Sequence, residues 1–307
     1  MTNRVKVIII DNMISFQAKD TIVVPNTKPS MLIEKLPCLP ALIGKLAFKS
    51  STYELSDSLP ALRAQHKDLL IDANHLARYR ALCGFQPGSK IPATYLQTLA
   101  MPLLLNIMSN SQFPIRVIGK MHLSNQVSVH ENFDLRQPVS LSVSIGRSLL
   151  SSRGLEWKMD FAAMVDNQLV WSGDSIYLYK CKTGMSRRKK GKLIRGDNPQ
   201  DWLVPNGIGR RYALISQDCN PFHLSNLTAR MFGFRSAIAH GMWTKARCIA
   251  GLEDQLPDSG YSVNVNFYRP LFLPSKVKFF TRQLDSGQHF SLFNKRGEKP
   301  YLTGLIS

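Results

Sequence analysis

One short stretch of the chain carries side chains that could do acid–base chemistry. It reads Asp218-Cys219-Asn220-Pro221-Phe222-His223, so a carboxylate and an imidazole stand five residues apart. The Asn-Pro pair cannot continue a helix, because proline lacks an N–H and restricts the residue before it. The turn can therefore direct Asp218 and His223 towards one point. A carboxylate and an imidazole that converge on one water make an acid–base pair.

The same hexamer also has an ordinary structural explanation. Asp and Asn before Pro are common turn residues, so the pattern alone is more often a turn than a catalyst. Its surroundings favour the catalytic interpretation. A short apolar approach, 212–216, precedes it, and a segment of helical character, 224–234, follows it. The triplet Ala239-His240-Gly241 then opens an apolar run at 242–252.

Together these features resemble the MaoC-like hydratases, also called the hydratase 2 family. In that family an Asp-x-Asn-Pro-x-His segment is followed by a His-Gly pair that opens the long central helix of a hot-dog fold. The resemblance covers about 205–307. It departs at one position, because Gln217 stands where the family usually has glycine before the Asp.

The family reaction is the reversible hydration of a trans-2-enoyl thioester to the (R)-3-hydroxyacyl thioester, a carbon–oxygen lyase activity. The resemblance implies that Asp218 and His223 hold the water and pass its protons, in roles that the sequence does not divide between them. The Gly241 amide would face the thioester oxygen, since a helix N-terminus offers free N–H groups. Asn220 would either orient the Asp218 carboxylate or brace the turn. His240 is expected to be structural.

The resemblance implies neither a cofactor nor a metal. The substrate partner would be an acyl-CoA or an acyl thioester on acyl carrier protein, and the sequence does not choose between them. The assembly state is equally open, with a homodimer as one candidate. Cys219 lies inside the hexamer but lacks a base partner, so we interpret it as a packing residue and not a nucleophile.

Three short echoes indicate that the chain contains a diverged duplication. In order, the paired segments are 78–82 with 211–214, 137–139 with 269–271, and 170–173 with 301–304, at offsets of 133, 132 and 131 residues. Each half also has an apolar helical run, 94–108 or 242–252, followed by strand-like segments. We expect strands at 115–123, 139–144, 155–165 and 168–178, and again at 263–268, 276–284, 289–294 and 301–306.

A long helix followed by a meander of strands predicts an α+β unit, with the helix on one face of an antiparallel sheet. Two such units would form the double hot dog that the resemblance implies. We predict an N-terminal extension of unassigned role (1–50), a non-catalytic first repeat (51–182), a basic linker (183–204) and a catalytic second repeat (205–307). The first half lacks both the hexamer and the His-Gly pair, so one chain should carry one active site.

Composition limits the remaining classes of function. With 44% hydrophobic residues in 307, the chain can build two compact cores. Its five cysteines are scattered and form no Cys-x-x-Cys pair, so neither a disulfide framework nor a zinc site is expected, and a reducing cytoplasm fits. The longest apolar stretch, 91–108, is interrupted by polar residues and proline. It predicts a buried helix and not a membrane span.

The formal net charge of +18 suggests polyanionic partners. Part of it lies in the block 187–192, which we interpret as a solvated linker. No RNP, zinc-finger or helix-turn-helix pattern supports a nucleic-acid partner. An acidic carrier protein or the phosphates of coenzyme A would explain the same charge. The alternative to an enzyme is a non-catalytic hot-dog protein that binds acyl thioesters or a partner protein.

Overall fold

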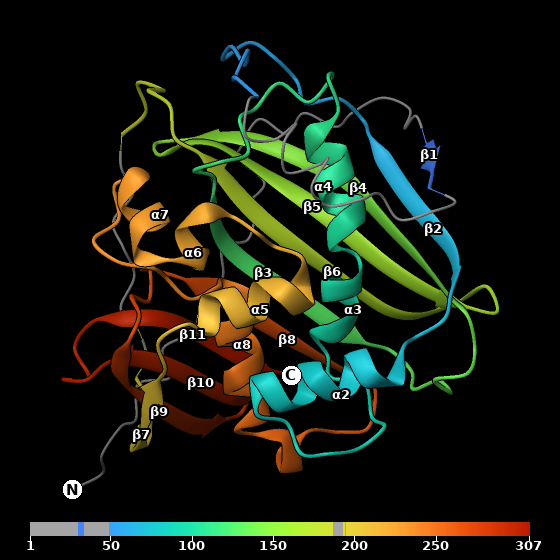
Figure 1. Cartoon of the computed structure of the whole chain (residues 1–307), viewed down its shortest axis with the longest axis vertical. Coiled ribbons are helices and arrows are strands. Elements are labelled where there is room, and N and C mark those ends of the chain that lie inside the picture. Colours follow the sequence, from blue (N-terminus) through green and yellow to red (C-terminus); the bar gives the residue numbers. More distant parts are fainter. Residues whose placement is uncertain (1–29, 34–48, 187–192, 194) are drawn as a thin grey trace, which may run out of the picture.

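The computed structural model describes residues 30–33, 49–186, 193 and 195–307. Most of the predicted extension 1–50 and the whole basic block 187–192 lie outside these residues. Eleven strands of the described residues form one sheet in the order β1-β2-β4-β5-β6-β3-β8-β11-β10-β9-β7 (Figure 1). Every neighbouring pair in the sheet is antiparallel except β1–β2, which is parallel.

The strands of the first half are β1 Ser30–Leu32, β2 Arg63–Leu69, β3 Met121–Val129, β4 Val139–Ser151, β5 Gly154–Val165 and β6 Gln168–Tyr179. Those of the second half are β7 Asp197–Val204, β8 Tyr261–Phe267, β9 Ser275–Leu284, β10 Gly287–Asn294 and β11 Pro300–Ile306. In the first half the strand order is β2-β4-β5-β6-β3, and in the second half it is β8-β11-β10-β9-β7. Read from the outer edge inwards, the second half therefore has the same strand order as the first. They join where β3 pairs with β8, from Ser124↔Asn266 to Val129↔Tyr261.

The helices of the described residues are α2 Ala73–Cys83, α3 Tyr95–Leu99, α4 Met101–Ser109, α5 Ile208–Ser216, α6 Pro221–Leu224, α7 Asn226–Met231 and α8 Gly241–Ala250, with a 3₁₀ turn η1 at Glu253–Gln255. Figure 1 shows α2, α3, α4, α5 and α8 on one face of the sheet. This arrangement confirms the predicted α+β class with two hot-dog repeats. No helix in the described part of the chain has the length and apolar character needed to span a membrane.

The structure differs from the predicted elements in three places. The run 94–108 is two helices that meet at Ala100, two residues before Pro102, because proline is tolerated in the first turn of a helix but not in its interior. The strand expected at 115–123 is β3, shifted to Met121–Val129, and Ile115 is a buried loop residue. A polar, mostly exposed edge strand, β7, lies within the range predicted as linker, because an edge strand facing water has the composition of a loop.

A buried polar network joins the two halves beneath the helices. Lys245 of α8 is fully buried, and its Nζ donates to the Asn125 side-chain oxygen at 2.6 Å, the Asn125 carbonyl at 3.2 Å and the Val263 carbonyl at 2.8 Å. The Asn125 amide in turn donates to Gln97 of α3 at 2.8 Å. Burial lowers the pKa of Lys245 well below its usual range, and the three acceptors offset part of the cost of burying an ammonium group. The network ties both central helices to the β3–β8 junction.

Candidate active site

The backbone turns sharply where α5 ends and the hexamer begins. Gln217 caps α5 in the left-handed conformation, with φ of 65°, and its N–H donates to the Ala213 carbonyl at 2.8 Å. Left-handed backbone costs little for glycine and about 1–2 kcal/mol for other residues. The position at which the chain departs from the family pattern is therefore one where glycine has a physical advantage. Gln217 adopts the same type of turn at a higher conformational cost.

Asn220 contacts the Asp218 carboxylate directly. Its side-chain amide donates to Asp218 Oδ1 at 2.5 Å, and its backbone N–H lies 3.4 Å from the same oxygen. The Asn220 side chain makes no capping hydrogen bond to α6. Of the two roles that the sequence left open for Asn220, this contact supports orientation of the carboxylate.

His223 is held in one orientation by the backbone. It lies in the short helix α6, is buried, and its Nδ1 is 2.8 Å from the Ile238 carbonyl oxygen. A carbonyl can only accept, so Nδ1 carries the proton of the neutral imidazole. The other nitrogen, Nε2, is then left with a lone pair that can accept a proton.

His240 lies next to both members of the predicted pair. Its Nε2 is 2.8 Å from the backbone oxygen of Asp218, and its ring stacks on that of His223 with centroids 3.6 Å apart. Side-chain atoms of Asp218, His223 and His240 lie within 4.8 Å of one another. Structure thus brings the carboxylate and the imidazole together, as the sequence predicted, and adds a second imidazole.

Gly241 opens α8 beside this group. A Cβ built at Gly241 would lie 3.2 Å from the Phe267 ring, closer than most packed side chains tolerate. No side chain caps the start of α8 within the described structure, and its first intrahelical bond runs from Thr244 N–H to the His240 carbonyl. The N–H groups of its first turn therefore remain available to an anion or a developing oxyanion.

The electrostatic environment sets different charge states for the three groups. Burial alone would raise the pKa of Asp218, but His240, His223 and Lys120 together hold that pKa below its usual range. Burial and the neighbouring His240 lower the pKa of His223 to about 3, and burial lowers the pKa of His240. Near neutral pH, Asp218 is therefore ionised and both imidazoles are neutral. The carboxylate and His223 Nε2 are both proton acceptors.

A carboxylate and two imidazoles are also ligand types for a divalent cation. A metal ion must lie close to the plane of each imidazole that binds it, about 2.0–2.1 Å from the nitrogen. The His223 and His240 planes are inclined by only 24° and are stacked face to face. Two nearly parallel rings do not share a point at bonding distance, so this geometry suits proton transfer and not metal binding.

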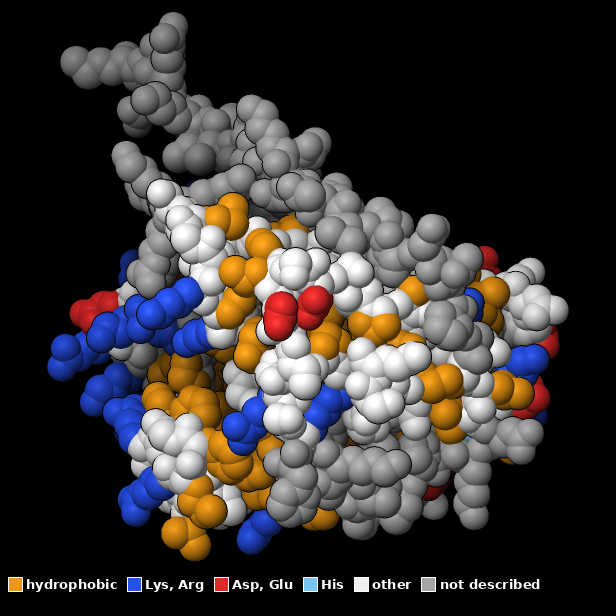
Figure 2. Space-filling model, turned by 90° about the horizontal axis from the view of Figure 1, so that it is seen from above, with side chains coloured by type: hydrophobic (Ala, Val, Ile, Leu, Met, Phe, Trp, Pro, Cys, Tyr) orange, Lys and Arg blue, Asp and Glu red, His pale blue; other side chains and the backbone are white. Residues whose placement is uncertain are grey.

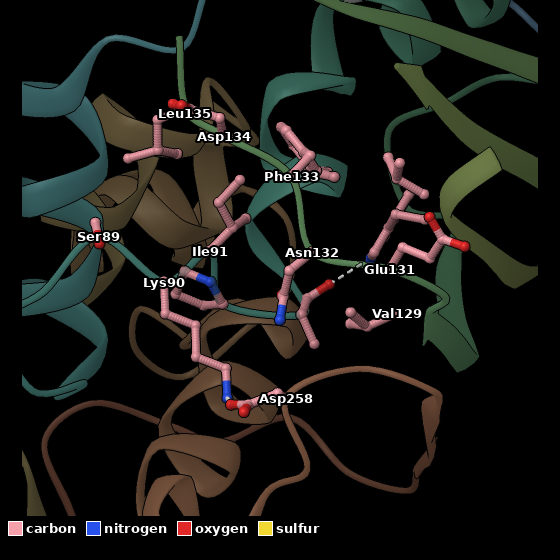
Figure 3. Close-up of a pocket in the computed structure, with 15 residues that line it drawn as sticks. Ser89, Lys90, Ile91, Val129, Glu131, Asn132, Phe133, Asp134, Leu135 and Asp258 are labelled. Carbon is pink, nitrogen blue, oxygen red and sulfur yellow. Dashed lines mark hydrogen bonds and ion pairs between the residues drawn. The ribbon is translucent and has the colours of Figure 1, made fainter. Parts of the chain in front are cut away.

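A cavity of about 630 Å³ lies elsewhere, in the first half (Figure 3). It opens between the loop around Lys90 and the loop around Phe133, and a 3.0 Å ion pair between Lys90 and Asp258 lies at its edge. The lining residues do not include Asp218, His223 or Gly241. In the second half, the matching loops are joined by a bridge between Ile238 and Phe272. The first-half loop, 84–93, contains no Asp or His, and the described cavity lining includes no histidine, so the cavity lacks an Asp–His pair like that of the second half.

Sequence reasoning missed three residues that interact with the pair. Lys120, His122 and Tyr177 belong to the first half, and each interacts electrostatically with Asp218. They lie at the start of β3 and in β6, far from the hexamer along the chain. No local pattern marks them, because only the pairing of β3 with β8 brings the two halves together at this point.

Fold and site together define a double hot-dog protein with an Asp–His pair in its second half. Residues 208–302 match the family model described as MaoC like domain. The second half of the chain is therefore similar to the MaoC-like domain.

Known proteins resemble this chain over most of its length. It is 29% identical over 259 residues to 3-hydroxyacyl-thioester dehydratase X of Mycobacterium tuberculosis strain H37Rv, covering 82% of this chain and 91% of that protein. The crystal structure of HtdX of Mycobacterium tuberculosis is 26% identical, with a TM-score of 0.70, over 80% of this chain and 98% of that one. A MaoC-like dehydratase from Phytophthora capsici shares the fold at 14% identity, with a TM-score of 0.67 over 83% and 98% of the two chains.

Proposed function

We propose that this protein is a carbon–oxygen lyase that dehydrates (R)-3-hydroxyacyl thioesters and hydrates trans-2-enoyl thioesters. One observation carries the proposal: an ionised Asp218 and a neutral His223 lie together beside the uncapped start of α8 at Gly241. The 29% identical relative is named as a dehydratase of 3-hydroxyacyl thioesters, and this supports the same substrate class. The R configuration rests on the family resemblance.

The geometry suggests how the hydration step proceeds. Asp218 or His223 Nε2 accepts a proton from a water molecule while the water oxygen bonds to C3. The C2=C3 π pair moves towards C1, and negative charge develops on the thioester oxygen. That oxygen would accept from the Gly241 N–H at the start of α8, an interaction of a kind that typically contributes ~3 kcal/mol. C2 then takes the proton, so one water is added in total.

Charge on the proposed catalytic repeat supports an anionic carrier for the acyl group. Between 202 and 252 the one acidic residue is Asp218, whereas four exposed arginines, Arg210, Arg211, Arg230 and Arg235, lie in the same span. Figure 2 shows many Lys and Arg side chains along its left edge, the side on which Figure 1 places α6 and α7. Acyl-CoA and acyl carrier protein both fit this charge, and the four free thiols among the described residues fit a reducing cytoplasm.

Substitution of the pair tests the proposal. Asp218→Asn and His223→Ala should each lower kcat for hydration of an enoyl-CoA by at least ~100-fold, with circular dichroism that shows an intact fold. The double variant should be little slower than the slower single one, because groups that act as a unit are not additive. His130→Ala, which removes an exposed imidazole of the first half, is the matched control. Near-normal turnover in either single variant would exclude the assignment.

The competing function is a non-catalytic protein that binds acyl thioesters. It predicts that wild-type protein binds enoyl-CoA and hydroxyacyl-CoA without interconverting them. Loss of the enone absorbance on mixing with enoyl-CoA, followed by chiral analysis of the product, separates the two functions. A product of S configuration would contradict the stereochemical part of the proposal alone.

A further inference from the structure

Three helices border the turn that carries the proposed pair. The helix α5 ends at Ser216, just before Asp218, and α6 and α7 follow the turn. The helix α6 contacts both α5 and α7, and Figure 1 shows the three next to one another. Asp218, Cys219 and Asn220 are each half-buried, so the turn between α5 and α6 is open to solvent. The outer faces of α5 and α7 therefore border an opening towards the pair.

Both outer helices expose apolar side chains together with arginine. We call the following exposed side chains the α5–α7 surface: Arg210, Arg211, Leu214, Leu227, Arg230 and Met231. Residues three or four apart lie on the same face of a helix, so each helix contributes one outward stripe. Leu214, Met231 and Leu227 are 79%, 76% and 73% exposed, the highest values among the large hydrophobic side chains that the structure describes. Single exposed leucines are ordinary, but three beside one site, rimmed by charge, mark a binding surface.

The α5–α7 surface carries charge of one sign. Between 202 and 252 the one acidic residue is Asp218, which lies in the turn itself. Arg210, Arg211 and Arg230 form no ion pair with any carboxylate of the described residues. Figure 2 shows hydrophobic side chains beside Lys and Arg on the side where Figure 1 places α6 and α7. These cations are therefore available to an acidic partner, which they attract over about 10 Å.

The size and charge of this surface select its occupant. Two copies of the chain related by a two-fold axis would place arginines against arginines. Coenzyme A would satisfy the cations with its phosphates, but it is small beside a surface that extends over two helices, and it would leave apolar side chains in water. A folded acidic protein would cover both helices at once and pair their arginines with carboxylates.

We propose that the α5–α7 surface docks an acidic acyl carrier protein, whose flexible arm then delivers the acyl thioester past the turn to Asp218 and His223. The identity of the cargo rests on the proposed function, whereas docking itself needs no turnover. The carrier protein, and not coenzyme A, is then the partner to which this surface is fitted. Coenzyme A thioesters remain substrates, because the pair and Gly241 act on the acyl end alone.

Binding of the carrier protein without an acyl group is the first test. The fluorescently labelled holo form of the acyl carrier protein from the same organism is titrated with this protein, and anisotropy gives Kd. The variant Leu214→Ser/Leu227→Ser/Met231→Ser should bind about tenfold more weakly than wild type, because it removes the apolar centre of the surface. The matched control, Lys67→Gln/Leu70→Ser, changes an exposed lysine and leucine at the end of β2 and should bind like wild type.

Salt dependence tests the contribution of charge. Arg210→Gln/Arg211→Gln/Arg230→Gln should weaken carrier binding about tenfold at low salt, and the difference from wild type should shrink to about twofold near 0.5 M salt. A wild-type protein that binds no carrier would overturn the proposal, and so would unchanged Kd values in both triple variants.

Turnover of two matched substrates separates docking from the pocket. With the crotonyl thioester of the carrier protein, the apolar triple variant should lose about tenfold in kcat/KM, as it does in binding. With crotonyl-CoA it should stay within about twofold of wild type, because coenzyme A does not cover the apolar side chains. Equal losses on both substrates would show that these side chains shape the thioester pocket and do not dock a protein.

Anionic vesicles test the other occupant that exposed leucine and arginine would suit. Vesicles of phosphatidylcholine with about 30% phosphatidylserine are sedimented with wild type and with the apolar triple variant. Vesicle binding that this variant loses, while its carrier binding is unchanged, would assign the surface to a membrane and overturn the proposal. Carrier binding that this variant loses, in a protein whose wild type hydrates neither crotonyl substrate, would refute the proposed function and leave the docking surface standing.

Discussion

The imidazole rings of His223 and His240 stack with their centroids 3.6 Å apart and their planes inclined by 24°. His240 also reaches the Asp218 backbone oxygen at 2.8 Å, while its Nδ1 is buried without a partner in the described structure. It therefore contacts both members of the proposed pair through packing and a backbone hydrogen bond. We therefore expect His240 to support the pair, and its burial lowers its pKa and keeps it neutral near pH 7.

Removing His240 should be less damaging than removing His223. His240→Ala deletes the stacked ring and the bond to the Asp218 carbonyl, so the pair loses its fixed geometry but keeps both reacting groups. We expect kcat for hydration to fall about tenfold, against at least ~100-fold for His223→Ala. The variant His223→Ala/His240→Ala should be no slower than His223→Ala by more than about twofold. Equal losses in the two single variants would give His240 a direct part in proton transfer.

Acid should destabilise the fold from pH 6.5 downwards. Burial lowers the pKa of His223 and His122 to about 3 and that of His289 to about 4, from 6.5 in an unfolded chain. Above pH 6.5 these histidines are neutral in both the folded and the unfolded chain, so they do not lower the free energy of unfolding. Below it the unfolded state binds protons that the folded state does not, so each histidine removes about 1.4 kcal/mol per pH unit until its folded pKa is reached.

His289 allows a clean measurement of this effect, because it lies in β10 and takes no part in the proposed site. His289→Leu should reduce the slope of the free energy of unfolding against pH by about 1.4 kcal/mol per unit between pH 6 and 4.5. Urea titrations at several pH values give that slope, and turnover at pH 7.5 should be unchanged. An identical slope in wild type and variant would show that His289 titrates normally in the folded protein.

Most of the second half could be predicted from its sequence, because its signals are local. The alternation of residues along the chain predicted the strands. The His240-Gly241 pair predicted the start of α8, which begins at Gly241, one residue before the apolar run. The contributions of Lys120 and His122 could not be predicted, since only strand pairing between the halves brings them to Asp218. The polar strand β7 could not be predicted either, because it is an edge strand that faces water on one side and has the composition of a loop. Domain boundaries and the role of 1–50 stay predictions.

The left-handed cap at Gln217 predicts a stabilising substitution. Glycine would relieve about 1–2 kcal/mol of backbone strain and lose about 0.5–1 kcal/mol through its greater freedom in the unfolded chain. Gln217→Gly should therefore raise the free energy of unfolding by up to about 1.5 kcal/mol and leave kcat unchanged. Gln217→Val, with a branched Cβ at the same φ of 65°, should lower stability instead. A loss of stability in the glycine variant would show that the glutamine side chain compensates for its backbone.

The ion pair between Arg80 and Glu253 should be a main link between the two halves. Arg80 of α2 is buried and donates to Glu253 Oε1 at 2.6 Å and to the carbonyls of Gln86 and Lys90. The second carboxylate oxygen accepts from Gln86 N–H at 2.7 Å. In the second half, the residue that echoes Arg80 is Ala213, and the loop that carries the proposed Asp218–His223 pair lies where the first half has the loop that Arg80 holds. The first half thus has a charged clamp where the second half has the proposed acid–base loop.

Breaking this clamp should lower the free energy of unfolding strongly and change kcat little. Arg80→Met leaves the Glu253 carboxylate and two carbonyls without their donor. Breaking a buried ion pair typically costs about 3–5 kcal/mol of unfolding free energy. We expect about 3 kcal/mol, because the Glu253 side chain is 16% exposed. Glu253→Gln, which keeps an acceptor, should cost about 1–2 kcal/mol. Lys278→Met breaks the exposed pair with Asp201 and, as the control, should cost less than about 1 kcal/mol.

Urea midpoints measure the stability of all three variants. The kcat at urea concentrations below the unfolding transition should stay within about threefold of wild type, since Arg80 contacts neither Asp218 nor His223. A cost for Arg80→Met no larger than that of the control would mean that water readily satisfies Glu253 and that the halves are held by packing alone.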